Sequence, residues 1–551
     1  MSCEVRLGLV DDGTICTLYL GLRRIPGPKA EPVRLAPHSS SPVYPLGTAN
    51  RRACVRIIDL ICARYFDDRV AADPARVFDP VVPGEENPQC RQSDDVLQLV
   101  SAFTLALNLV VGALSALTAP LIGALSDRYG RKRLIVISSS GAIIGEVITI
   151  LAAKYPNSIH YNWLLLGSFF DGLTGSFTAG SILSHAYTAD CTPPSKRSVA
   201  IGYLHSCLFS GLAFGPLLAG YFVKWTGSLV SIFYVTLGCH IFFIFFMSCI
   251  APESLSKRRQ QMAREKYKAE RAARAPVPGW NLHGASGGVP SAKGLAEAMQ
   301  SVMAVNPFGP LKVLFPPGPQ HSRLRRNLVT LAFIDMWLLG AAMSAGGVTV
   351  IYTEKMFGWR NFETSRFVSM VSMVRVLVLM GIYPVVNYVF RTRRNARRQR
   401  REGGAPMAEK NAGADELDIW VLRSALLSDV MGATGYIFSR TSGPFILSAI
   451  VTAFGGMGSA TIQAALSKHV PAEQVGELLG GIGQLHSLAR VVSPIVFNGL
   501  FYATVKTFPQ AFFVLLTAIF ALALGASFLV RPHGMFAPFL TSAGAQADVN
   551  C

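Results

Sequence analysis

The segment GALSDRYGRKR, Gly123–Arg133, decides how the rest of the chain is interpreted. It separates two long apolar runs, 96–122 and 134–153. Its glycines allow a tight turn between packed helices, and its cluster of cations suits the boundary between a bilayer and water. Asp127 is placed to sit near a helix N-terminus, where the helix dipole favours a carboxylate. The segment therefore predicts a short loop that joins two membrane-spanning helices.

Further apolar runs of similar length follow along the chain, and a helix needs about 20 residues to cross a bilayer. Because no water reaches the hydrocarbon core, backbone N–H and C=O groups must pair within each run, so the runs are expected to be helices. The eleven runs are 96–122, 134–153, 161–186, 199–223, 229–250, 328–350, 367–390, 419–438, 445–466, 478–502 and 510–530. The pattern predicts an all-α, polytopic membrane protein, and this number of spans does not fit a seven-helix receptor.

The composition supports the same class. Of the 551 residues, 51% are hydrophobic and only 15% are charged, whereas a soluble domain carries about 25% charged residues. The mean hydropathy is +0.37, and the 50 glycines suit helices that approach one another closely in a bilayer. We therefore expect one large membrane bundle rather than several soluble domains.

The net charge of +18 lies almost entirely in alternate loops. The stretch 252–326 contains 13 Lys and Arg against 4 Asp and Glu, and 391–417 contains 8 against 4. The loops at Gly123–Arg133 and Lys196 are also basic, whereas the intervening loops carry little charge. By the positive-inside rule, the basic side is cytoplasmic. The cations of RTRRNARRQRR are thus expected to lie near lipid headgroups rather than to bind nucleic acid.

The long basic stretch divides the chain into two helix bundles. Within it, KRRQQMAREKYKAERAAR (257–274) has the composition of a surface helix on the cytoplasmic face, and NPFGPLKVLF (306–315) is a short amphipathic piece. The expected organisation is an atypical N-terminal segment, an N-terminal bundle, a cytoplasmic central loop, a C-terminal bundle and a short tail, at 1–95, 96–251, 252–326, 327–531 and 532–551 respectively.

The loop between the first two runs resembles the signature loop of the major facilitator superfamily, G-x-L-x-D-R-x-G-R-R/K. The matching residues are Gly123, Leu125, Asp127, Arg128, Gly130, Arg131 and Lys132. The resemblance implies two six-helix bundles related by an axis along the membrane normal, with this loop holding the halves together in the outward-facing state. The second-half counterpart would follow Tyr388, where NYVFRTRRNARR keeps the cations but lacks the aspartate and the glycines.

A second motif, GLAFGPLLAG, resembles the G-x-x-x-G-P-x-x-G-G pattern of the family's fifth helix, which is often associated with antiporters. Its residues are Gly211, Gly215, Pro216 and Gly220. A simple packing seam is the alternative, because glycines four apart permit close helix contact and a proline bends a helix. The preceding ADCTPPSKRSVAIGYL (189–204) resembles tetracycline-efflux-type members, and the region also resembles the solute-carrier group that contains the proton-coupled folate transporter.

Numbered by the family, the eleven runs correspond to helices 2 to 12, so a first helix is not evident. The longest apolar stretch upstream, ICTLYLGL (15–22), is too short to span. Residues 1–55 look like a replacement for that helix, through an alternative start, a mispredicted exon or a true eleven-helix variant. LICARYF resembles the exterior segment that follows helix 1. A disulfide between Cys62 and Cys90 in this exterior, oxidising location is a hypothesis.

Charged and polar residues inside the runs point to mechanism, because a charge at mid-bilayer costs about 2.5–3.5 kcal/mol. The candidates for a solute or proton path are Glu146, Asp171, Thr174, Thr178, Asp335, Arg375, Asp429, His486 and Arg490. One polar face is predicted along 171–185, where polar residues recur at helical spacing. Its members are Asp171, Thr174, Thr178, Ser181 and His185. The alternative is that some of the charged residues form structural ion pairs between helices.

These features predict a secondary active transporter of a small organic solute, coupled to protons and working by alternating access. The histidines His205, His240 and His486 are further candidates to carry a proton, because the ordinary pKa of histidine lies near physiological pH. The glycine motif slightly favours antiport in the efflux direction. Symport of an anionic nutrient is the rival, because Arg375 and Arg490 can pair with a carboxylate. The other class of function is a non-transporting membrane protein, either a sensor derived from a transporter or an inactive truncated product.

The sequence also predicts what the protein does not do. It contains no nucleotide-binding loop of the G-x-x-x-x-G-K-S/T form and no catalytic triad or metal-binding spacing. We therefore expect neither an enzyme nor a bound cofactor or metal, with the proton gradient as the driving force. The expected partners are the lipid bilayer, the solute and protons. A monomer in the plasma membrane or in a vacuolar or other internal membrane is expected.

Overall fold

The computed structural model describes residues 60–70, 93–155, 158–226, 230–273, 310–316, 322–359, 361–393, 413–471 and 474–532. Within these ranges every regular element is helical, which confirms the predicted all-α class. The interpretations of 1–55 fall outside them.

The helices that precede the basic stretch coincide with the predicted runs. They are α3 (Asp94–Tyr129), α4 (Arg131–Lys154), α5 (Trp163–Leu173), α6 (Ser176–Cys191), α7 (Pro194–Thr226) and α8 (Val230–Cys249). A short helix at 60–70 packs through Ile61 against Val96 and Val100 at the start of α3. We call α3–α8 the first half of the molecule.

The helices that follow the basic stretch form the second half. They are α11 (Ser322–Phe357), α12 (Asn361–Leu377), η3 (Val378–Ile382), α13 (Tyr383–Asn387), η4 (Tyr388–Thr392), α15 (Glu416–Phe438), α16 (Ser442–Ala453), α17 (Gly456–Lys468), α18 (Val475–Thr504) and α19 (Ala511–Ser527). The elements α12 to η4 follow one another without a break, and η3 and η4 are π-helical turns within this long rod. All eleven predicted runs are therefore helical, and seven of the described segments are long and apolar enough to cross a membrane by length and composition alone.

Two of the predicted runs are interrupted. The run 161–186 divides into α5 and α6 at Thr174 and Gly175, where Gly175 has a left-handed backbone with φ of 85°. Glycine adopts this conformation without the strain that a side chain would cause. In the second half, Phe454 and Gly455 separate α16 from α17. The two breaks give each half one discontinuous helix.

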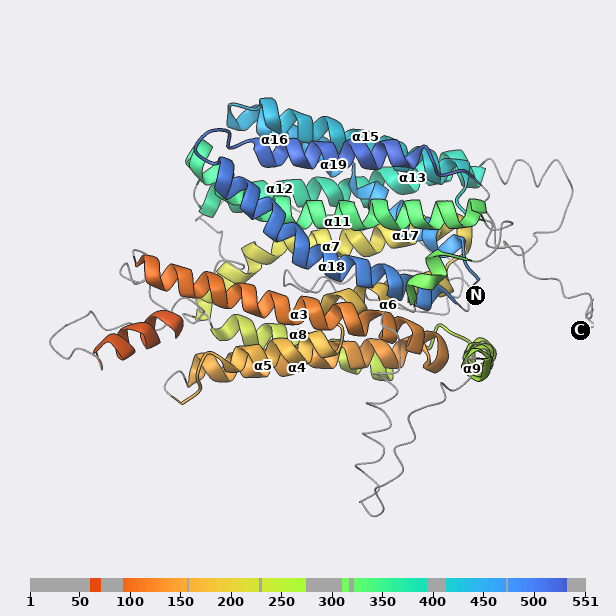
Figure 1. Ribbon diagram of the computed structural model, residues 1–551, viewed down its shortest axis with the longest axis horizontal. Helices are drawn as coiled ribbons and strands as arrows, with labels where there is room; N and C mark the ends of the chain where they lie inside the picture. Colours follow the sequence, from red (N-terminus) through yellow and green to blue (C-terminus); the bar gives the residue numbers. More distant parts are fainter. Residues whose placement is uncertain are drawn as a thin grey trace, which may run out of the picture.

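The two halves lie side by side, and helices of each half pack against helices of the other. Figure 1 shows the long helices running roughly parallel, with the second half stacked on the first. In the same view, α18 lies against α3 near the end where α9 is found and diverges from it toward the opposite end. In turn, α7 of the first half packs against α12 and α17 of the second. The halves are thus closed at one end of the molecule.

The closed end is the one that carries the basic segments. Helix α9 (Lys257–Ala273) is seen end-on in Figure 1, across the end of the bundle, which confirms the predicted surface helix. The short helix at 60–70 lies at the opposite end. The positive-inside rule places the α9 end in the cytoplasm, so the structure is closed toward the cytoplasm.

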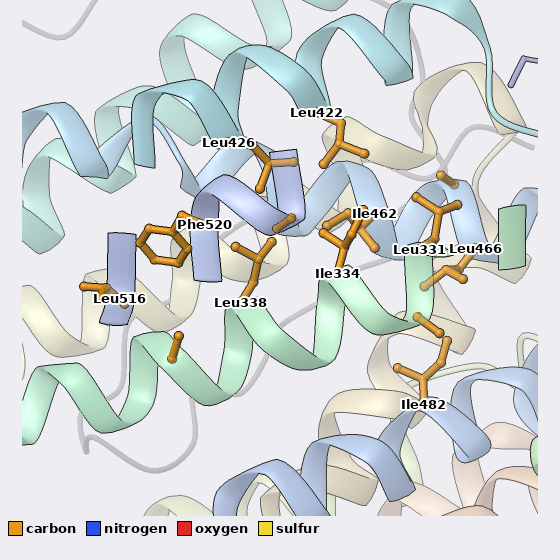
Figure 2. Close-up of a cluster of buried hydrophobic side chains, with 14 of the residues drawn as sticks. Leu331, Ile334, Leu338, Leu422, Leu426, Ile462, Leu466, Ile482, Leu516 and Phe520 are labelled. Atoms are coloured by element: carbon orange, nitrogen blue, oxygen red, sulfur yellow. The ribbon is translucent and has the colours of Figure 1, made fainter. Parts of the chain in front are cut away.

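The second half contains the larger apolar core. Figure 2 shows Leu331, Ile334 and Leu338 of α11 facing side chains of α15, α17 and α19. The facing residues drawn there include Leu422, Leu426, Ile462, Leu466, Leu516 and Phe520. The first half contains a smaller core around Leu134, Leu183 and Phe246, and this half holds the cavity described below.

Candidate functional site

The signature loop, Gly123–Arg133, ties the halves together at the cytoplasmic end. Gly130, between α3 and α4, has φ of 99°, so this turn favours glycine. The carboxylate of Asp127 accepts hydrogen bonds from the backbone N–H groups of Gly476 at 3.1 Å and Glu477 at 2.8 Å. These amides open α18, where the helix dipole stabilises negative charge. Asp127 therefore caps a helix of the other half.

Arg131 lies between two carboxylates in the same loop. Its side chain is fully buried, and it forms ion pairs with Asp127 at 2.5 Å and with Asp190 of α6 at 3.1 Å. Glu253, which follows α8, accepts the backbone N–H of Arg131 at 2.8 Å. The start of α4 is thus fixed by the ends of α3, α6 and α8.

The other cations of the loop face the cytoplasmic surface. The guanidinium of Arg128 lies 3.5 Å from the centre of the Tyr267 ring of α9, and the Lys132 backbone N–H donates to Glu253 at 3.3 Å. Leu125 is exposed. The Arg128 contact joins the surface helix α9 to the loop, an arrangement that the sequence pattern did not predict.

A related arrangement in the second half could be predicted only in part. Arg391, at the end of the rod α12–η4, donates a hydrogen bond to Oδ1 of Asn387 at 3.0 Å. Asn387 lies four residues earlier, just as Asp127 lies four residues before its partner Arg131. Arg391 also donates to the Ser195 carbonyl oxygen at the start of α7, at 2.9 Å. The cations of NYVFRTRRNARR therefore include one that joins the halves, and an asparagine stands where the signature loop has its aspartate.

Further buried polar groups complete the cytoplasmic closure. Asp418 at the start of α15 pairs with Lys468 at 2.6 Å and with Arg391 at 2.8 Å. Arg197 of α7 donates to the Ser467 carbonyl oxygen of α17 at 3.3 Å. Burial lowers the pKa of His469, just beyond α17, to about 4, so this imidazole is neutral at physiological pH. Three separate contacts, through Asp127, Arg391 and Arg197, hold the two halves together here.

A second group of polar side chains joins α11, α17 and α18 around the buried carboxylate of Asp335. His486 of α18 contacts Asp335 of α11 at 2.7 Å, and Gln463 of α17 donates to the same carboxylate at 2.5 Å. Only 3% of the Asp335 surface is exposed. The sequence predicted Asp335 and His486 as separate candidates, and the structure brings them together. It also adds Gln463, which was not among the candidates from the sequence.

A pair of histidines adjoins this cluster. His185 of α6 and His205 of α7 meet through their Nε2 atoms at 3.2 Å, so at least one ring is neutral and accepts the hydrogen bond. The Nδ1 atom of His205 lies 3.2 Å from the Ser459 hydroxyl of α17. Ser459 lies one turn before Gln463 on the same helix. Helix α17 therefore contacts the histidine pair of the first half and the Asp335–His486 pair of the second.

Each helix break carries an aspartate that faces an arginine. At the end of α5, Asp171 accepts a hydrogen bond from the Ser176 hydroxyl at 2.7 Å and lies within electrostatic range of Arg490 of α18. In the second half, Asp429 of α15 lies against Gly455, at the break between α16 and α17, within range of Arg375. The structure therefore groups these four candidates into two Asp–Arg pairs.

The polar face predicted along 171–185 is divided by the break in the helix. Asp171, Ser181 and His185 line one cavity together. Thr174 instead lies against Gly141 of α4, and Thr178 contacts the Ser487 hydroxyl of α18 at 3.4 Å. The prediction of one continuous face was wrong, because the regular helical spacing ends at Thr174 and Gly175.

The cavity itself lies within the first half, between α4, α5, α6, α7 and α8. It encloses about 120 Å³, where one water molecule needs about 10–15 Å³, so it has room for several waters or a small apolar group. Its polar lining residues are Ser138, Ser139, Asp171, Ser176, Ser181, Ser184, His185, Tyr187 and His205. Its apolar wall includes Ile135, Leu204, Leu208, Phe243, Phe246 and Met247.

The remaining candidates, Glu146 and the glycine motif, lie outside the cavity and the two Asp–Arg pairs. Glu146 of α4 lies 3.5 Å from His240 of α8, which fits the alternative of a structural pair. In the glycine motif of α7, Pro216 lies inside the helix, and a Cβ added at Gly211 would meet nothing within 4 Å. Gly211 therefore does not serve a tight packing seam in this conformation. Gly215 and Gly220 also lie within α7.

The cysteine predictions concern the exterior end. Cys62, buried in the short helix at 60–70, is disulfide-bonded. Its predicted partner, Cys90, lies outside the described residues. Cys207, Cys239 and Cys249 carry thiols that form no disulfide in the described part of the chain.

The fold and the signature-loop geometry identify the family. The sequence profile of the Major Facilitator Superfamily matches residues 93–403, and the chain belongs to this family. Among solved structures, the human organic anion transporter MFSD10 matches with a TM-score of 0.56 and 16% identity, over 87% of this chain and 97% of that one. At this identity the likeness shows the fold.

Relatives of known sequence agree. The chain is 26% identical to the MFS-type transporter avaJ of Aspergillus versicolor, over 78% of this chain and 76% of that protein. It is 23% identical to the class C tetracycline resistance protein of Escherichia coli, over 74% and 83% respectively. It is 22% identical to the lysosomal proton-coupled steroid conjugate and bile acid symporter SLC46A3 of Gallus gallus, over 78% and 79%. The chain is an integral, multi-pass membrane protein of a family that carries out secondary transport of small solutes.

Proposed function

We propose that the protein is a proton-coupled secondary transporter of a small organic solute, which works by alternating access. The observation that carries this proposal is the contact of the buried Asp335 carboxylate with the partly buried His486 imidazole, 2.7 Å apart. A buried carboxylate and imidazole change their mutual attraction strongly when either gains or loses a proton, because the surroundings have a low dielectric constant. The pair is thus suited to carry the coupled proton.

The position of the pair suggests how protonation would act on conformation. Asp335 belongs to α11 and His486 to α18, and Gln463 of α17 binds the same carboxylate. The titratable groups facing Asp335 are His486 and, at longer range, His205 of α7. Protonation of Asp335 would weaken its contacts with α17 and α18 and so alter the helices that close the cytoplasmic end.

The direction of transport has two candidates. The glycine motif of α7 supports antiport, because Gly211 has no close neighbour and so is not explained by packing in this conformation. Symport of an organic anion is the second candidate. It is supported by Arg375 and Arg490, whose Nε groups are buried without a hydrogen-bond partner. The relative SLC46A3 is named as a proton-coupled symporter.

The protein is proposed to need neither a cofactor nor an energy source other than the proton gradient. We expect transport rather than enzymatic catalysis, with the proton gradient as the only energy source and with no cofactor. The chain is expected to act as a monomer. The opposing class, a sensor or inactive product of transporter ancestry, predicts a correctly inserted protein that moves no solute.

The test is solute movement in proteoliposomes containing the purified full-length protein, with an imposed pH gradient and a panel of labelled organic solutes. Wild-type protein should accumulate at least one solute in response to the gradient. Asp335→Asn should lose this dependence on the gradient but keep solute exchange without net flux, because an amide does not titrate. Asp67→Asn, at an exposed position of the short helix at 60–70, is the matched control and should behave as wild type.

Two results would overturn the proposal in different ways. Transport by wild type that ignores the pH gradient would remove proton coupling. Coupling that survives in Asp335→Asn would remove the role given to the Asp335–His486 pair. An inserted wild-type protein that moves none of the panel would favour the non-transporting class.

A further inference from the structure

Arg490 is a partly buried cation whose donors are incompletely used. Its Nε group is buried without a hydrogen-bond partner. Its guanidinium lies 4.8 Å from the centre of the Phe177 ring, which belongs to the other half. Asp171 is within electrostatic range, but no ion pair within 4.0 Å joins the two side chains in the described part of the chain. A buried guanidinium in this state has unused capacity for a planar anion.

The break between α5 and α6 adds to this capacity. Helix α6 is 16 residues long, and no side chain caps its first turn. The beginning of a helix favours negative charge, because its first N–H groups point outward without partners in the helix. Ser176, the first residue of α6, supplies a hydroxyl next to Asp171. Arg490 and this helix start thus converge on one place at the boundary between the halves.

The cavity of the first half opens from the same place. Asp171, Ser176 and Phe177 all line it. Beyond them its wall is largely apolar, with Phe243, Phe246 and other side chains of α4, α7 and α8. A solute with a charged head and an apolar body fits this distribution, with its head beside Arg490 and its body in the cavity.

We propose that Arg490 and the start of α6 bind the head group of a carboxylate-bearing organic anion, while Asp171 takes up a proton when the anion arrives. This inference rests on the proposed transport function and names its substrate class. The charged and titratable groups facing Asp171 are Arg490 of α18 and His240 of α8, and Glu146 of α4 lies 3.5 Å beyond His240.

The coupling follows from competition for one cation. An ionised Asp171 and a bound carboxylate repel each other, and both are attracted to Arg490. Protonation of Asp171 removes that repulsion, so the anion binds together with a proton. Loading of both on the same side of the membrane favours symport over antiport.

The other Asp–Arg pair does not have these surroundings. Asp429 packs directly against Gly455, and Arg375 lies 4.9 Å from the Phe209 ring. Neither Asp429 nor Phe209 lines the described cavity, whereas Asp171 and Phe177, the neighbours of Arg490, both do. We therefore assign the anion to Arg490 alone.

The experiment measures ligand-dependent thermal unfolding of the purified full-length protein in detergent. The probes are matched pairs of a carboxylate and its neutral amide, namely benzoate with benzamide, phenylacetate with phenylacetamide, and cyclohexanecarboxylate with cyclohexanecarboxamide. Wild type should be stabilised by at least one carboxylate more than by its amide, and more strongly at acidic than at alkaline pH. Binding constants follow from the concentration dependence of the shift.

The variants separate the two roles. Arg490→Gln should weaken carboxylate binding about tenfold or more, as expected for loss of a charge-assisted hydrogen bond. Asp171→Asn should bind the carboxylate equally well at both pH values, because it mimics the protonated state. Arg423→Gln is the matched control, since Arg423 of α15 also lies over a phenylalanine ring, Phe528, and also has a buried Nε group without a hydrogen-bond partner. Neither Arg423 nor Phe528 lines the cavity. It should bind as wild type does.

Several results would overturn the inference. One is wild-type protein that binds no carboxylate better than its amide at either pH. Another is Arg490→Gln that keeps the wild-type preference. If Arg490→Gln fails to fold, Asp171→Asn still decides, because unchanged pH dependence in that variant contradicts the competition. Proton-coupled flux of neutral solutes alone would refute the anion site while leaving the proposed function intact.

Discussion

At the scale of single residues, the cytoplasmic end depends on charges that have been taken out of water. Arg131 is fully buried between Asp127 and Asp190. One cation compensates two carboxylates, and the start of α18 stabilises one of them further. Removing one member of such a group leaves the others buried and uncompensated, which costs more than the attraction itself contributes.

Arg131→Gln should therefore lower the free energy of unfolding by about 3–5 kcal/mol, since it leaves Asp127 and Asp190 without their cation. The measurement is thermal or denaturant unfolding of the purified protein in detergent. Arg133→Gln removes an exposed cation of the same loop and should change stability by less than about 0.5 kcal/mol. Equal losses in the two variants would show that burial of Arg131 is not what matters.

At the scale of helices, α3 and α18 approach so closely that side chains are excluded between them. A Cβ at Gly123 would lie 2.8 Å from the Cα of Gly480 and would overlap the Gly476 carbonyl oxygen. Gly480 in turn faces Pro120. A Cβ added at Gly480 would lie 3.1 Å from the Cα atom of Pro120. This contact allows Asp127 to reach the start of α18.

Gly123→Ala should separate α3 from α18 and weaken the cytoplasmic closure. Gly499→Ala, on the outer part of α18 where an added Cβ meets nothing within 4 Å, is the matched control. It should stabilise the helix by up to about 1 kcal/mol, because alanine is the better helix former. Hydrogen exchange of the amides at 475–484 should become faster in Gly123→Ala and not in Gly499→Ala. Unchanged exchange in both would contradict the role assigned to this crossing.

The helices also show what could be predicted from the sequence and what could not. Their existence followed from apolar runs, and the signature loop identified the family, because both are local patterns. The break at Gly175 could not be predicted, because nothing in the sequence distinguishes a glycine with a left-handed backbone from the other glycines among the 50 in the chain. Nor could the contact of Asp335 with Gln463, which lie 128 residues apart and meet only through tertiary packing.

At the scale of the whole molecule, the halves must move against each other if a solute is to cross. The hydroxyls of Ser115 on α3 and Ser487 on α18 lie 3.1 Å apart and belong to different halves. A covalent cross-link between these two positions would prevent α3 and α18 from moving apart.

The double variant Ser115→Cys, Ser487→Cys should lose solute flux in proteoliposomes after mild oxidation and regain it after reduction. The short distance between the two hydroxyls is compatible with a disulfide, whose Cβ atoms lie about 3.5–4.5 Å apart. Each single variant should be insensitive to oxidation. Full activity of the oxidised double variant, with the cross-link confirmed by mass spectrometry, would show that the halves need not move at this contact.

The seal made by Asp127 on the first amides of α18 has a consequence for the cell. In this conformation, buried charge pairs join the two halves on the cytoplasmic side. We expect this closure to prevent ions from leaking down their gradient when no cargo is bound. The carrier can therefore remain in an energised membrane without dissipating the voltage or acidity on which neighbouring proteins depend.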